Sequence, residues 1–332
     1  MNHYKSDNSM NSEITTGVER NKWLSVVQWV ILAIAYFVVI YKLVTFEDYD
    51  ILLSFFSHIT FYQCAGIVVV LFLFPLNLLL EALKWKVSVS GISKISVRQA
   101  VVSTFVGNVG AVITPNRLGD FPARVAYLGL NNKVEAVLLG MIGSALLSVV
   151  IVSFGLLALI QYISVSGYNV VSRSYLFIVL SLIVLAIFLI VILPIVVKKI
   201  NALELKSRYM NSFFSELSKM SYRKIFDLTL LSLLRYIVFF SQYTIILLVF
   251  SNQITLAGAV MVIPIVYLFT TITPTISASE AATRAGYALL LFEPLSVAAP
   301  SVVLATLILW IINNGIPICV GLILSNFNVI KI

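Results

Sequence analysis

Long apolar stretches without a charged residue recur along the chain and constrain its fold more than any other feature. A helix that spans a membrane needs roughly 20 mostly apolar residues. The chain has 332 residues, of which 60% are apolar and only 11% are charged, so an ordinary soluble domain is excluded. The sequence predicts an all-α integral membrane protein with about seven transmembrane helices. The predicted spans are 23–41, 61–83, 134–163, 174–197, 226–250, 255–273 and 297–325.

The loops between these spans orient the chain in the membrane. Lys and Arg in short loops favour the cytoplasmic side, whereas acidic residues count little. Loops 84–99 and 198–224 are basic and are predicted to be cytoplasmic, whereas loop 42–60 has one Lys among acids and is predicted outside. Residues 1–22 are polar and lack the features of a signal peptide. We therefore expect a cytoplasmic N-terminal tail, followed by a single polytopic membrane domain over 23–332.

Two segments are too short for a full crossing. Both ends of segment 100–133 are expected on the cytoplasmic side, and its apolar part is followed by Thr114-Pro115-Asn116. It is predicted to be a re-entrant broken helix, and segment 274–293 is predicted to be a second one. Irregular backbone at membrane depth is tolerated only where it is buried in protein or lines a wet cavity.

The two re-entrant segments resemble each other. Each reads Thr-Pro, a short polar turn, an acid, and an Arg four residues after the acid: Asp120 with Arg124 in the first copy, Glu280 with Arg284 in the second. Residues at i and i+4 lie on one face of a helix. Broken helices at matching positions in two halves are a pointer to the substrate site of a transporter. The sequence therefore predicts two repeated halves.

The residue types of the copies favour an anionic ligand. Helix N-termini attract anions, and Arg presents planar donors that suit phosphate. The alternative is that each acid–Arg pair is only a salt bridge at the membrane boundary. The predicted headgroup-binding residues are Asn116, Arg117, Asp120, Arg124, Arg235, Glu280 and Arg284, with Asn77, Glu81 and Lys84 as secondary candidates.

Four of these candidates lie within or at the end of predicted spans. Arg235 falls near mid-depth, where it either faces a cavity or an acid, or snorkels to the surface. Glu81 and Lys84 close a span, where plain interfacial anchoring is the alternative. Asn77, like the pair Asn313-Asn314, is expected to bond between helices.

Catalytic and metal chemistry find no support in the sequence. Cys64 and Cys319 lie in apolar runs without a partner at ligand spacing, so we expect small core residues and no metal site. The net charge of +8 is spread thinly and does not predict nucleic-acid binding. No nucleotide-binding motif or nucleophile–base pair is present, so no catalytic residue and no cofactor are predicted.

Three ordered motifs resemble the lysylphosphatidylglycerol synthase transmembrane-region family, whose members are also called flippase-like domain proteins. They are Pro75-Leu76-Asn77 with Glu81 to Trp85, Thr114 to Asp120 with Arg124, and Thr273-Pro274-Thr275 with Ser279-Glu280 and Arg284. The resemblance covers about residues 23–325. It implies a stand-alone member without the synthase domain, located in a bacterial inner membrane, that moves a lipid or lipid-linked molecule between leaflets.

Three functional hypotheses follow. The first is a flippase-like transporter of a phospholipid or lipid-linked molecule. The second is an integral-membrane transferase with Asp120 or Glu280 as general base. The third is a non-transporting scaffold that recruits a soluble synthase through loop 198–224. Expected partners are membrane lipids, a lipid-linked substrate, and a soluble synthase or a second copy of the chain.

Overall fold

The computed structural model of the chain describes residues 60–112, 114, 117–165, 220–251, 253–273, 275 and 277–329. Every regular element among these residues is a helix, and all of them belong to one compact unit. The all-helical fold is thus confirmed for this part of the chain. The predicted N-terminal tail, the spans 23–41 and 174–197, and most of the basic loop 198–224 lie outside the described residues.

Four helical stretches within the described residues are long and apolar enough to cross a membrane. Three are single helices: α3 (Phe61–Val89), α6 (Lys133–Val165) and α9 (Tyr222–Phe250). The fourth runs through α12 (Ala299–Trp310), the π turn η3 (Ile311–Gly315) and α13 (Ile316–Val329). They coincide with the predicted spans 61–83, 134–163, 226–250 and 297–325, so a membrane protein is supported at this level.

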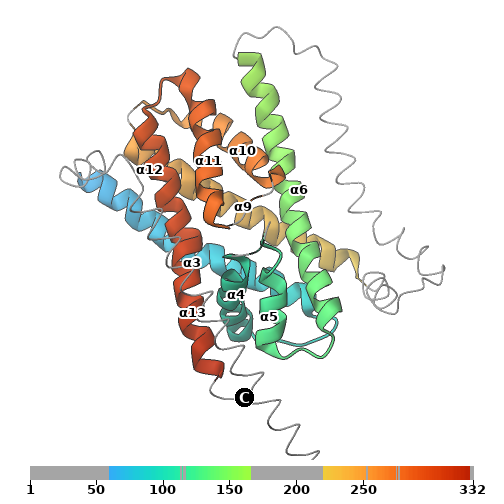
Figure 1. Cartoon of the computed structure of the whole chain (residues 1–332). Helices are drawn as coiled ribbons and strands as arrows, with labels where there is room; N and C mark the ends of the chain where they lie inside the picture. The colour runs from blue at the N-terminus through green and yellow to red at the C-terminus, as the bar shows by residue number, and fades with distance from the viewer. Residues whose placement is uncertain are drawn as a thin grey trace, which may run out of the picture. The chain divides into compact units, whose positions relative to one another are not determined.

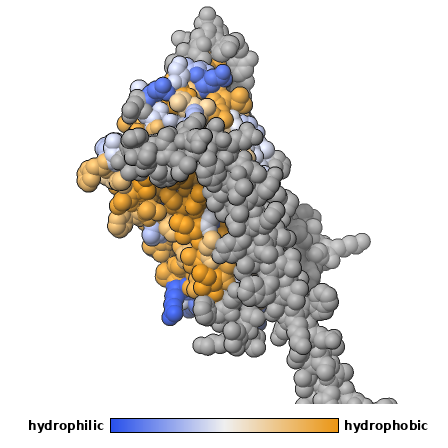
Figure 2. All heavy atoms as spheres, turned by 60° about the vertical axis from the view of Figure 1, so that its left-hand side comes forward, coloured by the Kyte–Doolittle hydropathy of each residue, from blue (hydrophilic) through white to orange (hydrophobic). Residues whose placement is uncertain are grey.

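The outer surface of these helices is apolar. On α3 alone, Phe61, Tyr62, Phe72 and Val68 are between 48% and 90% exposed. Figure 2 shows a broad hydrophobic surface with hydrophilic residues gathered at either end of it. A patch of this kind marks an interaction surface in a soluble protein, whereas lipid tails cover it without cost in a bilayer.

Two pairs of shorter helices lie between the long ones. The first pair is α4 (Val97–Val112) with α5 (Asp120–Leu128), and the second is α10 (Leu256–Ile272) with α11 (Ser277–Phe292). At a rise of 1.5 Å per residue these helices extend about 14 to 26 Å, less than the roughly 30 Å of a bilayer core.

The first helix of the second pair is shorter than the other predicted spans that the structure describes. Segment 255–273 was expected to cross the membrane, but it forms the 17-residue helix α10, which packs against α11. The helix begins at Thr255, whose hydroxyl accepts from the Gly258 amide, and it ends at Thr273. Hydropathy alone does not separate such a short helix from a full span, because the segment is apolar up to its last turn.

Helices from the first part of the chain, α3 to α6, pack against helices from the second part, α9 to α13. Besides the central contact of α3 with α9, helix α4 packs on α13, and α10 packs on α6. The first helix of each short pair therefore contacts the long helix that follows the other pair. As a result the turns of the two pairs approach each other in the interior (Figure 1), where Arg117 lies 3.9 Å from Glu280.

The π turn follows from a proline. Pro317 has no amide hydrogen to give the carbonyl of Asn313 four residues earlier, so the helix widens locally instead of continuing as α. Such single π turns are frequent at functional sites. Here the turn carries Asn313 and Asn314.

The cysteine prediction was wrong in one respect. Cys64 on α3 and Cys319 on α13 are free, but both are exposed rather than packed in the core. They lie on the outer apolar surface of their helices, where lipid replaces the protein core as the apolar environment.

Candidate functional site

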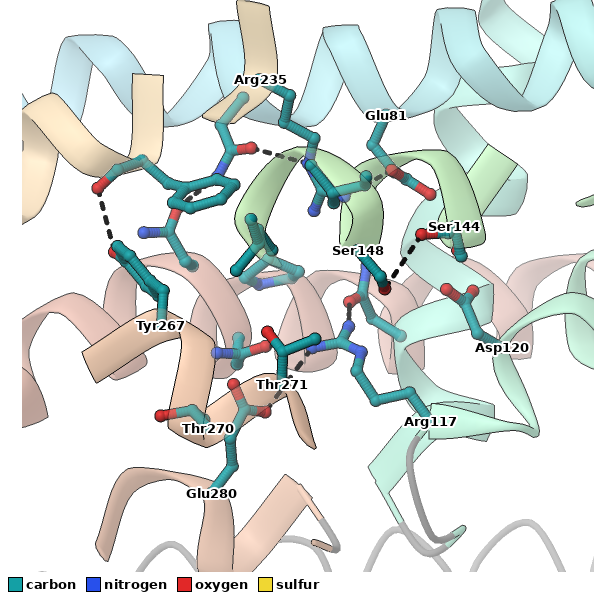
Figure 3. Close-up of a pocket in the computed structure, with 18 of the residues that line it drawn as sticks. Glu81, Arg117, Asp120, Ser144, Ser148, Arg235, Tyr267, Thr270, Thr271 and Glu280 are labelled. Atoms are coloured by element: carbon teal, nitrogen blue, oxygen red, sulfur yellow. Dashed lines mark hydrogen bonds and ion pairs between the residues drawn. The ribbon is translucent and has the colours of Figure 1, made fainter. Parts of the chain in front are cut away.

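A cavity of about 480 Å³ opens where the turns of the two short pairs meet α3, α6, α9 and the π turn. Figure 3 shows side chains from all these elements converging on it. Eight of the ten residues singled out from the sequence line this cavity: Asn77, Glu81, Arg117, Asp120, Arg124, Arg235, Glu280 and Arg284. Lys84 does not line the cavity itself but contacts Glu81, which does. Asn116 lies outside the described residues.

Glu81 is the centre of a buried charge network. Its carboxylate forms ion pairs with Lys84 Nζ at 2.9 Å, with Arg124 Nη2 at 3.0 Å and with Arg235 Nη1 at 2.5 Å. Glu81, Lys84 and Arg124 are each at least 95% buried. Neither Glu81 nor Lys84 is therefore an interfacial anchor. Arg235 takes the first of its two expected roles, because it faces the cavity and an acid.

Arg124 joins this network to the first short pair. Its Nε and Nη2 donate to the two oxygens of Asp120 at 2.6 and 2.7 Å, and its plane lies against the rings of Trp85 and Phe121. A methyl group at Gly107 would collide with this pair, so the glycine makes room for it.

Arg117 stands at the turn of the first pair in an unusual conformation. Its φ of 60° lies in the left-handed region, which costs a non-glycine residue roughly 1 to 2 kcal/mol. The turn is held by Thr114, whose hydroxyl donates to the carbonyl of Gly110 and accepts from the Gly119 amide at 2.8 Å. Backbone strain retained at one residue is typical of functional positions.

The Arg117 side chain is held by neutral partners. Its two terminal nitrogens donate to Asn108 Oδ1 and Asn314 Oδ1, each at 2.5 Å. The nearest carboxylate, Glu280, is 3.9 Å away, and the side chain is 35% exposed. The amides orient the guanidinium into the cavity, but they do not neutralise its charge.

The second short pair supplies a matching acid and base. Glu280 accepts from Arg284, and the Arg284 guanidinium lies over the ring of Tyr267 at 5.4 Å. Arg284 Nε is buried, and no residue in the described part of the chain accepts from it. Each copy of the acid–Arg pair thus forms its salt bridge, and both pairs face one cavity rather than the membrane surface.

A relay of amides connects the charge network to the π turn. Asn77 accepts from Arg235 Nε at 2.9 Å and donates to Asn313 Oδ1 at 2.8 Å. Asn313 in turn donates to Gln242, which donates to the carbonyl of Val70. The expected interhelical hydrogen bond of Asn77 is present, and it fixes the orientation of Arg235.

One wall of the cavity carries hydroxyl groups. Ser148 on α6 and Thr270 on α10 donate to the carbonyl four residues earlier in their own helices, which leaves their oxygens free to accept. Ser144 and Thr271 line the same wall, and neither side-chain hydroxyl has a hydrogen-bond partner in the described residues. Figure 3 shows these four residues around the cavity.

No protein-family model, no curated protein and no solved structure matches the chain. The resemblance of its motifs to the flippase-like domain proteins accordingly stays a prediction from the sequence. The site is interpreted below from its own geometry.

Sequence reasoning missed several lining residues. Asn108 is a polar residue within an apolar stretch, nine residues before Arg117, and that isolation was the available signal. Ser144 and Ser148 are spaced to share one face of a helix, but serine in a spanning helix more often bonds its own backbone. Helix periodicity predicts such a shared face, but not the cavity that it lines.

The lining can bind an anion. Four arginines face the cavity against three carboxylates, and Lys84 behind the wall adds a further positive charge. Arginine is well suited to bidentate contacts with phosphate. Among the described residues no group of three His, Cys, Asp or Glu is arranged to hold a metal ion.

Proposed function

We propose that the chain is a flippase-like transporter that moves a phospholipid or a lipid-linked molecule between the two leaflets of a membrane. The observation that carries this proposal is the cavity itself. Charged side chains and side chains with hydroxyl groups line it, yet the helices around it have apolar outer surfaces. A charged cavity in a membrane domain is costly to maintain and marks a substrate pathway by default.

The chemistry of a lipid headgroup fits this cavity. A phosphate has three or four oxygens that accept hydrogen bonds, and Arg117, Arg284 and Arg235 offer donors from three different helices or turns. The acyl chains of the same lipid would remain against the apolar surface outside. This division, with polar contacts within the protein and apolar contacts in the bilayer, lets a headgroup cross without passing through hydrocarbon.

The order of the elements supports two repeated halves. A long helix, two short helices and a further long stretch occur twice, as α3 to α6 and as α9 to α13. Loop 42–60 before α3 is predicted outside, whereas loop 198–224 before α9 is predicted to be cytoplasmic. The two halves would therefore have inverted orientations in the membrane. Transporters built from inverted repeats place their substrate sites where broken helices meet.

We propose the remaining topology on the same grounds. The spans would number six, because α10 is one arm of a short pair and not a crossing, while the predicted spans 23–41 and 174–197 are kept. The N-terminus would be cytoplasmic, and the C-terminus would be cytoplasmic as well. Membership of the flippase-like domain family, an inner-membrane location, and a soluble synthase or a second copy of the chain as partner belong to this proposal.

A reconstitution experiment tests the transport. The full chain is incorporated into liposomes that contain a trace of lipid with a fluorophore on one acyl chain, and a membrane-impermeant reductant bleaches the outer leaflet. The panel includes phosphatidylglycerol, phosphatidylethanolamine and lysylphosphatidylglycerol, each with and without an imposed proton gradient. Faster movement of at least one lipid than in protein-free liposomes supports the proposal.

The variant Arg284→Gln provides the site control, and Arg98→Gln provides the matched surface control. Arg98 is exposed in the first turn of α4 and does not line the cavity. We expect Arg284→Gln to lose transport and Arg98→Gln to keep it. If no lipid of the panel moves under either condition, the transport proposal is refuted.

A further inference from the structure

The carboxylates of the cavity are already occupied. Glu81 is shared by Lys84, Arg124 and Arg235, and Asp120 binds Arg124 through both oxygens. Glu280 binds Arg284 and has Arg117 as its next cation. A ligand that brings an ammonium group would find no free carboxylate, and a charge buried without a partner is strongly disfavoured.

The cationic groups, in contrast, are available. Arg117 is held by two amide oxygens, is partly exposed to the cavity, and has no carboxylate within hydrogen-bond distance. Arg284 contributes a buried Nε without a partner in the described residues. Both observations point to an oxyanion that lies between the turns of the two short pairs.

The wall with the four hydroxyl groups indicates a second property of the ligand. The hydroxyl groups of Ser144 and Thr271 have no hydrogen-bond partner among the described residues, while Ser148 and Thr270 offer acceptor oxygens. Helices α6 and α10, which carry these four residues, pack against each other. Hydroxyl groups of a ligand can both donate to such a wall and accept from it.

We propose that the cavity takes an anionic lipid whose phosphate ester carries a hydroxyl-rich group, such as glycerol or a sugar, and that it discriminates against the same lipid bearing an ammonium group. This inference rests on the proposed function for its biological meaning, but it concerns binding alone. Arg117 and Arg284 bind the phosphate, and Ser144 and Thr271 bind the hydroxyl-rich part.

Native mass spectrometry of the purified full chain tests the proposal by titration with lipids that have identical acyl chains. Phosphatidylglycerol should bind at least about tenfold more tightly than lysylphosphatidylglycerol, because a buried charge without a partner costs more than a tenfold change in affinity. Equal or tighter binding of lysylphosphatidylglycerol overturns the proposal. So does free glycerol 3-phosphate binding as tightly as phosphatidylglycerol, since the ligand would then not be a lipid.

Two sets of variants assign the parts of the site. Arg117→Gln should weaken phosphatidylglycerol binding by about tenfold or more, whereas Arg98→Gln should not change it. Ser144→Ala combined with Thr271→Val should weaken binding of phosphatidylglycerol but not of phosphatidic acid, which lacks the glycerol. Ser153→Ala on α6, which does not line the cavity, is the matched control. An unchanged affinity in either site variant contradicts the assignment of that part.

The outcome separates this proposal from the transport proposal. A chain that prefers phosphatidylglycerol in the titration but moves no lipid in liposomes retains the ligand assignment and loses the transport function. A chain that moves lysylphosphatidylglycerol and binds it more tightly retains the transport function and loses the ligand assignment.

Discussion

Glu81 shows how a single acid organises the site. It is 95% buried, and three cations from three different segments of the chain share its two oxygens. A buried ion pair adds little to stability by comparison with apolar packing, but the removal of one partner leaves uncompensated charge. The main effect of losing Glu81 would therefore be three cations without their shared anion, rather than the loss of any one strong contact.

We predict that Glu81→Gln destabilises the folded protein by about 3 to 5 kcal/mol, since Lys84, Arg124 and Arg235 would lose their shared anion. The measurement is the unfolding temperature of the full chain in detergent. Glu293→Gln, at an exposed position between α11 and α12, should leave it unchanged. The double variant Glu81→Gln with Lys84→Met should recover part of the loss. A single variant as stable as the wild type would contradict this account.

The conformation of Arg117 gives a second prediction. Glycine adopts a φ of 60° without strain, whereas alanine is strained there as arginine is. Arg117→Gly should therefore be more stable than Arg117→Ala by about 1 kcal/mol, although both variants lose lipid binding. The two unfolding temperatures provide the comparison. In a helix or strand alanine would be the more stable, so the reverse order would show that this backbone is not left-handed.

At the residue scale the sequence indicated the charged members of the site but not their partners. Spacing predicted the pairs Asp120–Arg124 and Glu280–Arg284, because i and i+4 on a helix are neighbours. It could not predict the contact of Glu81 with Arg124 and Arg235, since these residues are 43 and 154 positions apart. Such contacts depend on how helices pack, which hydropathy does not encode.

The short helix pairs show what determines an element in this fold. Helices α4 and α5 approach closely because Gly110 and Gly119 face each other without side chains. An added Cβ at Gly110 would lie 2.5 Å from the carbonyl oxygen of Gly119 and 2.6 Å from the Ala123 side chain. The turn that carries Arg117 can close only because this space is empty.

Gly110→Ala should therefore force α4 and α5 apart, at a cost of about 1 to 3 kcal/mol, and should weaken lipid binding at Arg117. Gly286→Ala on α11 is the matched control, because its Cβ would meet no atom within 4 Å. There the change should raise stability by about 0.5 to 1 kcal/mol, since glycine is unfavourable within a helix. Both effects are measured as unfolding temperatures, and opposite signs are required. Two shifts of the same sign would count against the close approach.

Element boundaries were predicted from the sequence only where a polar break marked them. Segment 61–83 and helix α3 begin at the same residue, because Thr60 caps the helix start, where its hydroxyl and the side chain of Gln63 form a reciprocal capping box; the helix continues to Val89. The break at Thr114-Pro115 was recognised as the turn of a short pair. Segment 255–273 was predicted as a span because its residues are apolar to the end, whereas its partner, α11, carries the charges; α10 is shorter than the four long helical stretches.

At the scale of the whole molecule, the proposed topology depends on whether the two short helix pairs, α4 with α5 and α10 with α11, cross the membrane. A pair of short helices that does not cross returns the chain to the side from which it came. The loop before α4 contains Lys94 and no acid, whereas the turn before α12 contains Glu293 and no base. Because basic short loops favour the cytoplasmic side, the proposed topology has the connection before α4 inside and the turn before α12, which lacks a base, outside.

Thiol labelling in cells tests this arrangement. In a background with Cys64 and Cys319 replaced by Ala, Ser93→Cys should react with an impermeant maleimide only after permeabilisation. Ser296→Cys, in the turn between α11 and α12, should react in intact cells. The side on which Ser296 lies depends on whether α10 crosses the membrane. If it crossed the membrane as a full span and α11 did not, Ser296 would lie on the same side as Ser93. Equal protection of both cysteines would thus restore α10 as a crossing, whereas opposite accessibility would support two inverted halves that bring their broken helices together around one cavity.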